Sequence, residues 1–165
     1  MNLFRLRVVL LASAVLLVGC DHYTKQVAKV GLERSAPHTL VAGVLDLDYT
    51  ENTDSGFGLL RKVPVSIRTP ILTAAQMTGG AVMLLLCLRR KSRRGVRLAL
   101  LLLSAGALAN GIDRLARGYV VDFIHIHHWP VFNLADVYIT AGALLLFLGV
   151  RLASSVAPPA SPSSL

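Results

Sequence analysis

The stretch LLLSAGALANGIDRLARG, residues 101–118, places polar side chains inside a segment that is otherwise apolar enough to cross a membrane. Gly106, Asn110 and Arg114 recur every four residues, so a helix would align them on one stripe. The Ser, Ala and Gly residues around them permit close approach of a second helix. Polar groups are costly in lipid and usually face a partner or a watery cavity. The stretch therefore predicts a membrane helix whose polar stripe either ties neighbouring helices together or belongs to a functional site.

The composition of the whole chain also indicates an integral membrane protein. Of its 165 residues 54% are hydrophobic and 16% charged, and the mean hydropathy is +0.60. A hydrocarbon core about 30 Å thick requires roughly 20 mostly apolar helical residues. We predict one all-α membrane domain over residues 1–152, with four transmembrane helices at about 8–27, 67–88, 96–115 and 137–152. Residues 153–165 are rich in Pro, Ser and Ala and predict a disordered cytoplasmic tail.

The charges are distributed unevenly along the chain. Basic residues gather before the first span, in the link between the second and third spans, and after the fourth: Arg5, Arg7, Arg89, Arg90, Lys91, Arg93, Arg94, Arg97 and Arg151. This bias predicts that both termini and the link are cytoplasmic. Because the topology accounts for the net charge of +8, we expect no nucleic-acid partner. All nine acidic residues fall on the opposite side, which the topology rule does not require.

Two external segments show the alternation of half-exposed strands. Leu45, Leu47 and Tyr49 alternate with polar residues within 43–52, and the segment 118–136 alternates in the same way. We expect these strands to pair as a small extracytoplasmic β-sheet. Cys20 and Cys87 lie near opposite membrane faces, so no disulfide framework is predicted.

Four ionisable residues near the ends of the spans are candidates for a functional site. Asp21 and Lys25 are four residues apart and share a helix face, which is also the spacing of a simple ion pair. Asp122 lies in an apolar strand, and Asp136 opens the last helix, where an Asp is often only a cap. If the two aspartates meet, one carboxyl keeps a proton and the pair can activate a water. Their spacing alone does not bring them together.

Four stretches in order carry a resemblance to a known family: DHYTK at 21–25, ENTDSGFGLL at 51–60, AGALANGIDRLARGYVVDF at 105–123 and FNLAD at 132–136. Together they resemble the lipoprotein signal peptidase family, the type II signal peptidases of the bacterial inner membrane. The resemblance implies an aspartic endopeptidase that cuts prolipoproteins just before the diacylglyceryl-modified cysteine, at the extracytoplasmic face. It implies Asp122 and Asp136 as the catalytic dyad. It also implies supporting or substrate-binding roles for Asp21, Lys25, Asn52, Gly106, Asn110, Arg114 and Asn133.

The same resemblance implies no metal and no organic cofactor. The expected partners are lipid-modified prolipoproteins and membrane lipid, and a monomer is sufficient. Two positions depart from the family pattern: Asp54 stands where a glycine is usual, and Ala109 where a glycine commonly precedes the asparagine. Asp54 would repel the dyad if it faces the cleft, or impose a different turn. The alternative hypothesis is therefore a non-catalytic membrane binding paralogue of the same fold.

Two further motifs suggest other functions. LVGC at 17–20 has the form of a lipobox, but a helix-compatible sequence and three further spans follow Cys20, so we interpret it as part of the first span. HIHH at 125–128 raises the hypothesis of a Zn or Cu site, although so short a cluster is incomplete. The alternative interpretation is that these histidines are amphipathic rings at the membrane interface, beside Trp129.

Overall fold

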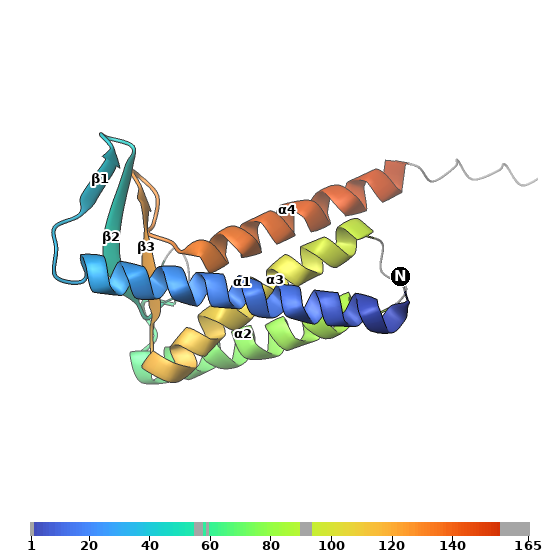
Figure 1. The fold of residues 1–165 in the computed structure, drawn as a ribbon. Coiled ribbons are helices and arrows are strands. Elements are labelled where there is room, and N and C mark those ends of the chain that lie inside the picture. Colours follow the sequence, from blue (N-terminus) through green and yellow to red (C-terminus); the bar gives the residue numbers. More distant parts are fainter. Residues whose placement is uncertain (1, 55–57, 59, 90–93, 156–165) are drawn as a thin grey trace, which may run out of the picture.

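The computed structural model describes residues 2–54, 58, 60–89 and 94–155. In this part of the chain the elements are α1 (Leu3–Leu32), β1 (His38–Val41), β2 (Leu45–Asn52), α2 (Val65–Cys87), α3 (Arg94–Arg117), β3 (Val120–Ile126) and α4 (Leu134–Ser155). The helices form an elongated bundle with the sheet at one end (Figure 1). The N-terminus and the last turns of α4 lie at the opposite end (Figure 1).

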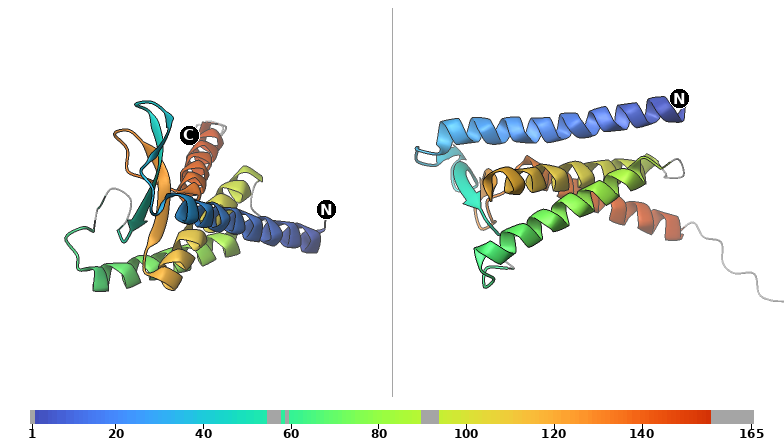
Figure 2. Two further views of the ribbon diagram at one scale, coloured as in Figure 1. Left: turned by 60° about the vertical axis from the view of Figure 1, so that its left-hand side comes forward. Right: turned by 90° about the horizontal axis from the view of Figure 1, so that it is seen from below.

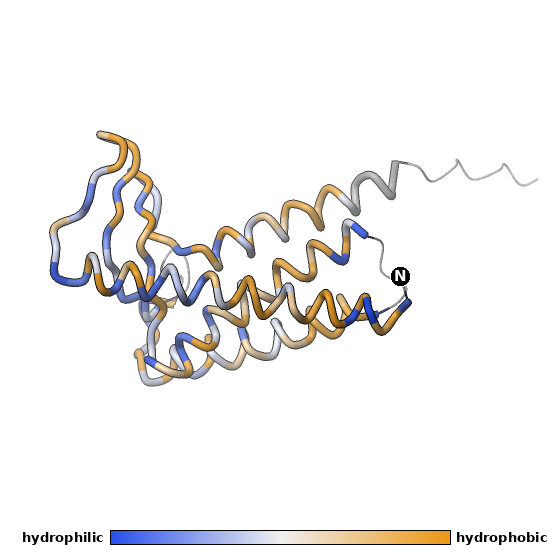
Figure 3. The backbone as a smooth tube through the Cα atoms, viewed as in Figure 1, coloured by the Kyte–Doolittle hydropathy of each residue, from blue (hydrophilic) through white to orange (hydrophobic). Residues whose placement is uncertain are grey.

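Helices form at all four predicted spans. By length and composition, α1, α2 and α3 can each cross a membrane, whereas the apolar part of α4, Leu134–Gly149, is shorter than a full span. Apolar residues run along the helices and hydrophilic residues gather toward the two ends (Figure 3). The fourth span therefore stays a prediction. Helix α4 extends to Ser155, into the predicted tail, while residues 156–165 and positions 90–93 of the basic link lie outside the described residues.

Helix α3 is the central element of the bundle. It packs against α1, α2 and α4, and it lies between α1 and α2 when the bundle is seen from below (Figure 2, right). Of the most apolar 18-residue stretch in each helix, 50% of the residues are buried in α3, compared with 11% in α1 and 11% in α2. In this interior position the polar stripe of α3 can find partners on the neighbouring helices within the membrane.

Small residues bring α3 and α4 close together. A Cβ on Gly142 would lie 2.8 Å from the carbonyl oxygen of Ala99 in α3. A Cβ on Gly106 would come still closer to the carbonyl oxygen of Ala135 at the start of α4. Both helix backbones therefore touch at positions that only glycine allows.

The sheet has the strand order β1-β2-β3, with both pairs antiparallel. The pairing of β2 with β3 confirms the predicted sheet, whereas β1 was not predicted as a strand. The register places Asn52 opposite Val120 and Thr50 opposite Asp122. A bridge between Ile124 and Phe132 then folds the chain back along β3. Residue 133 is thereby carried to the helix end of the sheet, beside the start of β3.

Candidate active site

The structure brings Asp122 and Asp136 together around one asparagine. Asn133 Nδ2 donates to Asp122 Oδ1 at 2.6 Å, and the Asn133 backbone N–H donates to Asp136 Oδ2 at 3.2 Å. In return, the Asp136 backbone N–H donates to Asn133 Oδ1 at 3.0 Å. The last two bonds form a reciprocal cap at the start of α4. Asp136 is therefore a helix cap, as its position suggested, and also the neighbour of Asp122.

Two more asparagines hold the outer oxygens of the two carboxyl groups. Asn52 Nδ2 donates to Asp122 Oδ2 at 2.7 Å, and Asn110 Nδ2 donates to Asp136 Oδ1 at 2.8 Å. Each of the four carboxyl oxygens thus accepts a hydrogen bond from an amide. These donors come from the end of β2, the middle of α3 and the start of α4, so the sheet and the bundle together fix the geometry of the pair.

The surroundings of Asp122 favour its protonated form. The side chain is only 2% exposed, and burial together with the nearby charge of Asp136 raises its pKa to about 7, against the hydrogen bonds from Asn52 and Asn133, which lower it. Burial penalises the ionised carboxylate, and a like charge penalises it further. At neutral pH this carboxyl can hold a proton beside an ionised partner, which is the arrangement that supplies one acid and one base.

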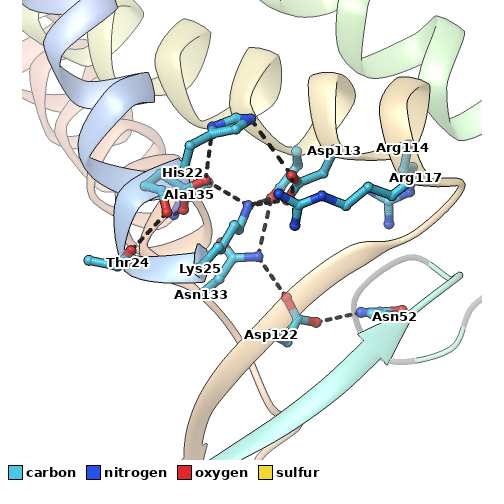
Figure 4. A network of polar contacts seen from close by, with 12 residues as sticks. His22, Thr24, Lys25, Asn52, Asp113, Arg114, Arg117, Asp122, Asn133 and Ala135 are labelled. Atoms are coloured by element: carbon cyan, nitrogen blue, oxygen red, sulfur yellow. Dashed lines mark hydrogen bonds and ion pairs between the residues drawn. The ribbon is translucent and has the colours of Figure 1, made fainter. Parts of the chain in front are cut away.

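A buried ion cluster lies directly behind the aspartates. Lys25 Nζ is 2.6 Å from Asp21 Oδ2 and 2.8 Å from Asp113 Oδ2, and it donates to Asn110 Oδ1 at 2.9 Å. The Asp21 and Lys25 side chains are fully buried, and Figure 4 shows Lys25 and Asn133 on the same side of Asp122. Asp21 also accepts from the backbone N–H of Ala135 at 2.8 Å. The ion pair expected within α1 thus joins α1 to α3 and to the start of α4.

Asp113 was not predicted as part of this cluster. Its carboxylate faces Lys25 and lies 3.7 Å from Nε2 of His22. The signal in the sequence was its place three residues after Asn110, which puts both side chains on one face of α3.

Gly106 and Arg114 lie near the aspartates without a hydrogen bond to either. Gly106 contacts the backbone of Ala135, so it sets how closely α3 meets the start of α4. Arg114 Nη1 donates to Gln76 Oε1 at 2.8 Å, and Nη2 donates to the carbonyl oxygen of Asp54. Arg114 therefore holds the backbone of residue 54, in the segment that follows β2.

The carboxylate of Asp54 faces a cation. Asp54 Oδ2 accepts from Arg68 Nη1 at 3.2 Å, and Oδ1 accepts from the backbone N–H of Leu60 at 3.2 Å. Within the described residues, His128 is the one non-glycine position with a positive φ, so Asp54 keeps ordinary backbone angles. The structure supports neither a repelling nor a strained Asp54. Sequence reasoning did not identify Arg68, and positions 55–57 and 59 of the ENTDSGFGLL motif lie outside the described residues.

The histidines of HIHH lie at the end of β3 and in the turn that follows it. His127 Nε2 lies 2.8 Å from Asp46 Oδ2 in β2, and its ring stacks on that of His125 with 5.5 Å between centroids. In the described ranges no three His, Cys, Asp or Glu side chains group as metal ligands would. The metal hypothesis therefore receives no support from these residues.

Comparisons with known proteins match the chain over most of its length. The family model described as "Signal peptidase (SPase) II" matches residues 13–152. A lipoprotein signal peptidase of Moorella thermoacetica is 35% identical over 136 residues, covering 81% of this chain and 86% of that protein. The corresponding protein of Francisella tularensis subsp. novicida is 31% identical over 151 residues, covering 88% and 93%.

The fold resembles that of solved bacterial membrane enzymes. One matches with a TM-score of 0.79 and 23% sequence identity, covering 95% of this chain and 94% of the other. A second matches with a TM-score of 0.74, again at 23% identity, covering 86% and 92%. The bundle with its terminal sheet is thus an architecture already known among membrane enzymes.

Proposed function

Since the chain belongs to the signal peptidase II family, we propose that it removes signal peptides from prolipoproteins as a membrane aspartic endopeptidase. The cleaved bond precedes the diacylglyceryl-modified cysteine, and Asp122 with Asp136 activates the attacking water. The observation that carries this proposal is the amide-held pair of aspartates, with Asp122 buried and Asp136 half-buried, bridged by Asn133. Such a pair supplies an acid and a base in a site where burial strengthens every electrostatic interaction.

In the proposed reaction the two carboxyl groups have different tasks. Asp136 lies in the first turn of α4, where the helix dipole favours a negative charge, and Lys25 lies behind it through Asn110. Ionised Asp136 therefore takes a proton from the water as the oxygen attacks the scissile carbonyl carbon. Protonated Asp122 donates its proton to the carbonyl oxygen. When the tetrahedral intermediate collapses, the C–N bond breaks and the proton held by Asp136 passes to the leaving nitrogen. The re-forming carbonyl returns its hydroxyl proton to Asp122, which restores the starting state of the pair.

We place this site at the extracytoplasmic face of a bacterial inner membrane, with both termini in the cytoplasm. The support is the charge pattern of the sequence: about half of the basic residues gather around the N-terminus, the link between the second and third spans and the end of the fourth, where no acidic residue occurs. Asp122 lies where the sheet meets the bundle (Figure 4), and Asp136 lies in the first turn of α4 next to it. A substrate anchored by its lipid in the outer leaflet would present its cleavage site at this level. We propose that the enzyme works as a monomer.

The test is cleavage of a diacylglyceryl-modified precursor by the purified full-length chain. Asp122→Asn and Asp136→Asn should each lower the rate by a factor on the order of 10² to 10⁴, the usual contribution of a positioned acid or base. Asp48→Asn, in strand β2, is the matched control and should leave the rate unchanged. Cleavage at the wild-type rate by either dyad variant would exclude the assignment.

The non-catalytic alternative depended on Asp54 disrupting the site. The Asp54 carboxylate lies 3.2 Å from Arg68 Nη1, and this cation offsets its negative charge. The same assay separates the two hypotheses: a wild-type chain that binds the lipidated precursor and leaves it uncut would favour the paralogue.

A further inference from the structure

The orientation of Asn52 depends on the backbone of residue 54. Asn52 Oδ1 accepts from the Asp54 N–H at 2.8 Å, and Asn52 Nδ2 donates to Asp122 Oδ2 at 2.7 Å. A flipped amide would turn its NH₂ toward the backbone N–H and its oxygen toward the carboxyl, losing both bonds. The position of residue 54 therefore decides whether Asp122 receives this hydrogen bond.

Residue 54 is in turn held by two arginines from different helices. Arg114 of α3 donates to its carbonyl oxygen, and Arg68 in the first turns of α2 donates to its carboxylate at 3.2 Å. Arg68 also donates to Thr53 Oγ1 at 2.9 Å and to the carbonyl oxygen of Leu60 at 3.4 Å. One guanidinium thus ties residues on both sides of the loop after β2 to the start of α2.

The ion pair between Arg68 and Asp54 is largely buried, which makes its loss more costly than that of a surface pair. Arg68 is 6% exposed, and the Asp54 side chain is 14% exposed. Removing the cation from a mostly buried ion pair is unfavourable, so loss of the Arg68 charge should weaken the hold on the Asp54 carboxylate and let residue 54 shift. Such a shift disturbs the backbone N–H that orients Asn52.

We propose that Arg68 and Asp54 form a positioning pair, which fixes the Asn52 amide on Asp122 from outside the catalytic dyad. The path runs from Arg68 to Asp54, from there to Asn52, and from Asn52 to the carboxyl group. Because the Asn52 bond lowers the pKa of Asp122, loosening the pair raises that pKa. The effect on turnover rests on the proposed peptidase function, whereas the effect on protonation can be measured without it.

The first experiment is an infrared titration of the full-length protein in lipid nanodiscs. The protonated carboxyl band that Asp122→Asn removes identifies Asp122. Arg68→Gln should move the midpoint of this band to higher pH and lower kcat/KM roughly tenfold or more, since small misplacements in a catalytic site are costly. Arg68→Lys keeps the charge and should recover part of both effects. Arg61→Gln, an exposed arginine in the same loop, is the matched control and should behave as wild type.

Double variants test the path itself. In an Asn52→Ala background, Arg68→Gln should add little to the midpoint shift, because the bond through which it acts is already absent. The neutral pair Arg68→Gln with Asp54→Asn should restore much of the loss, because the carboxylate charge is removed together with the cation that balances it. An Arg68→Gln shift that persists in full without Asn52 would overturn the proposal, as would an Arg68→Gln protein that matches Arg61→Gln.

Failure of this inference is distinguishable from failure of the proposed function. A wild-type protein that cleaves the precursor, with Arg68→Gln equal to the control in titration and turnover, sinks the positioning pair alone. A wild-type protein that never cleaves, yet shows the predicted midpoint shifts, sinks the peptidase assignment alone. If Arg68→Gln does not fold, Arg68→Lys and the neutral pair still give the comparison.

Discussion

At the scale of single residues, the protonation of Asp122 should be visible in the stability of the protein. Its pKa is about 7 in the folded state, compared with an ordinary value of 3.8, so the folded protein binds this proton more tightly than the unfolded chain. The contribution of this proton to the free energy of unfolding is therefore fully present below about pH 4 and declines as the pH rises toward 7. The decline amounts to a few kcal/mol at most, because one unit of pKa shift corresponds to about 1.4 kcal/mol.

Asp122→Asn removes this titration but turns an NH₂ group toward one of the two amide donors, so it loses one hydrogen bond at every pH. The melting temperature of the variant relative to wild type should therefore rise as the pH increases from about 4 to 8. Thermal unfolding of both proteins across this range measures it. Parallel pH curves for the two proteins would contradict the raised pKa.

Sequence reasoning at this scale identified the two aspartates and the three asparagines that hold them. The four motifs, taken in their order along the chain, singled out these residues as candidates. The contacts among them came from the structure. Arg68 stayed unrecognised because its partner Asp54 lies fourteen residues away across a loop, so no helical or strand period connects them. An ion pair closed by a loop leaves no pattern in the sequence.

At the scale of the elements, the contact between α3 and α4 should be sensitive to single methyl groups. Gly106→Ala would drive its Cβ into the Ala135 carbonyl and push away the first turn of α4, which carries Asp136. We expect a loss of roughly 1–3 kcal/mol of stability, as for other overpacked positions, and at least a tenfold loss of cleavage from misplacement of the carboxyl group.

Two glycines of α4, Gly142 and Gly149, provide the comparison with Gly106 of α3. Gly142→Ala meets the Ala99 carbonyl at 2.8 Å, well along α4 from Asp136, so it should cost similar stability but less activity. Gly149→Ala has nothing within 4 Å and should be neutral in both. Unfolding and cleavage measured together test the order. Full activity of the Gly106 variant would show that the start of α4 is not fixed by this contact.

The elements themselves were largely predictable, because long apolar runs leave few alternatives in a membrane chain. Helix α1 extends five residues beyond its predicted span at each end, from Leu3 to Leu32. Its polar residues Asp21 and Lys25 are satisfied inside the protein, so they do not end the helix. Strand β1 escaped prediction since it has only four residues and its pairing with β2 is irregular.

At the scale of the whole molecule, one lysine joins α1 to the rest of the bundle. Lys25→Met would leave Asp21 and Asp113 buried without their shared cation, and removal of one partner from a buried ion cluster costs about 3–5 kcal/mol. Lys29, one turn later, is about one-third exposed and pairs with Glu33 at 4.0 Å. Lys29→Met should therefore cost no more than about 1 kcal/mol. Equal effects on the free energy of unfolding would contradict the structural role of Lys25.

The overall arrangement could be predicted only in outline. Charge bias and hydropathy indicate the helices and their expected orientation, but they do not say which helix lies at the centre. The central place of α3 follows from glycine contacts and from Asp113, whose partners lie on other helices. The return of the chain along β3, through the bridge of Ile124 with Phe132, has no signal in a single sequence.

The four positions from Asn133 to Asp136 also limit how the chain can change in length. Within them, Asn133 bonds to Asp122, the Ala135 N–H bonds to Asp21, and Asp136 bonds to Asn110. One inserted residue would rotate everything after it by about 100° around α4 and break these bonds at once. Insertions and deletions should therefore be tolerated in surface loops and at the chain ends, while the spacing from 133 to 136 admits none.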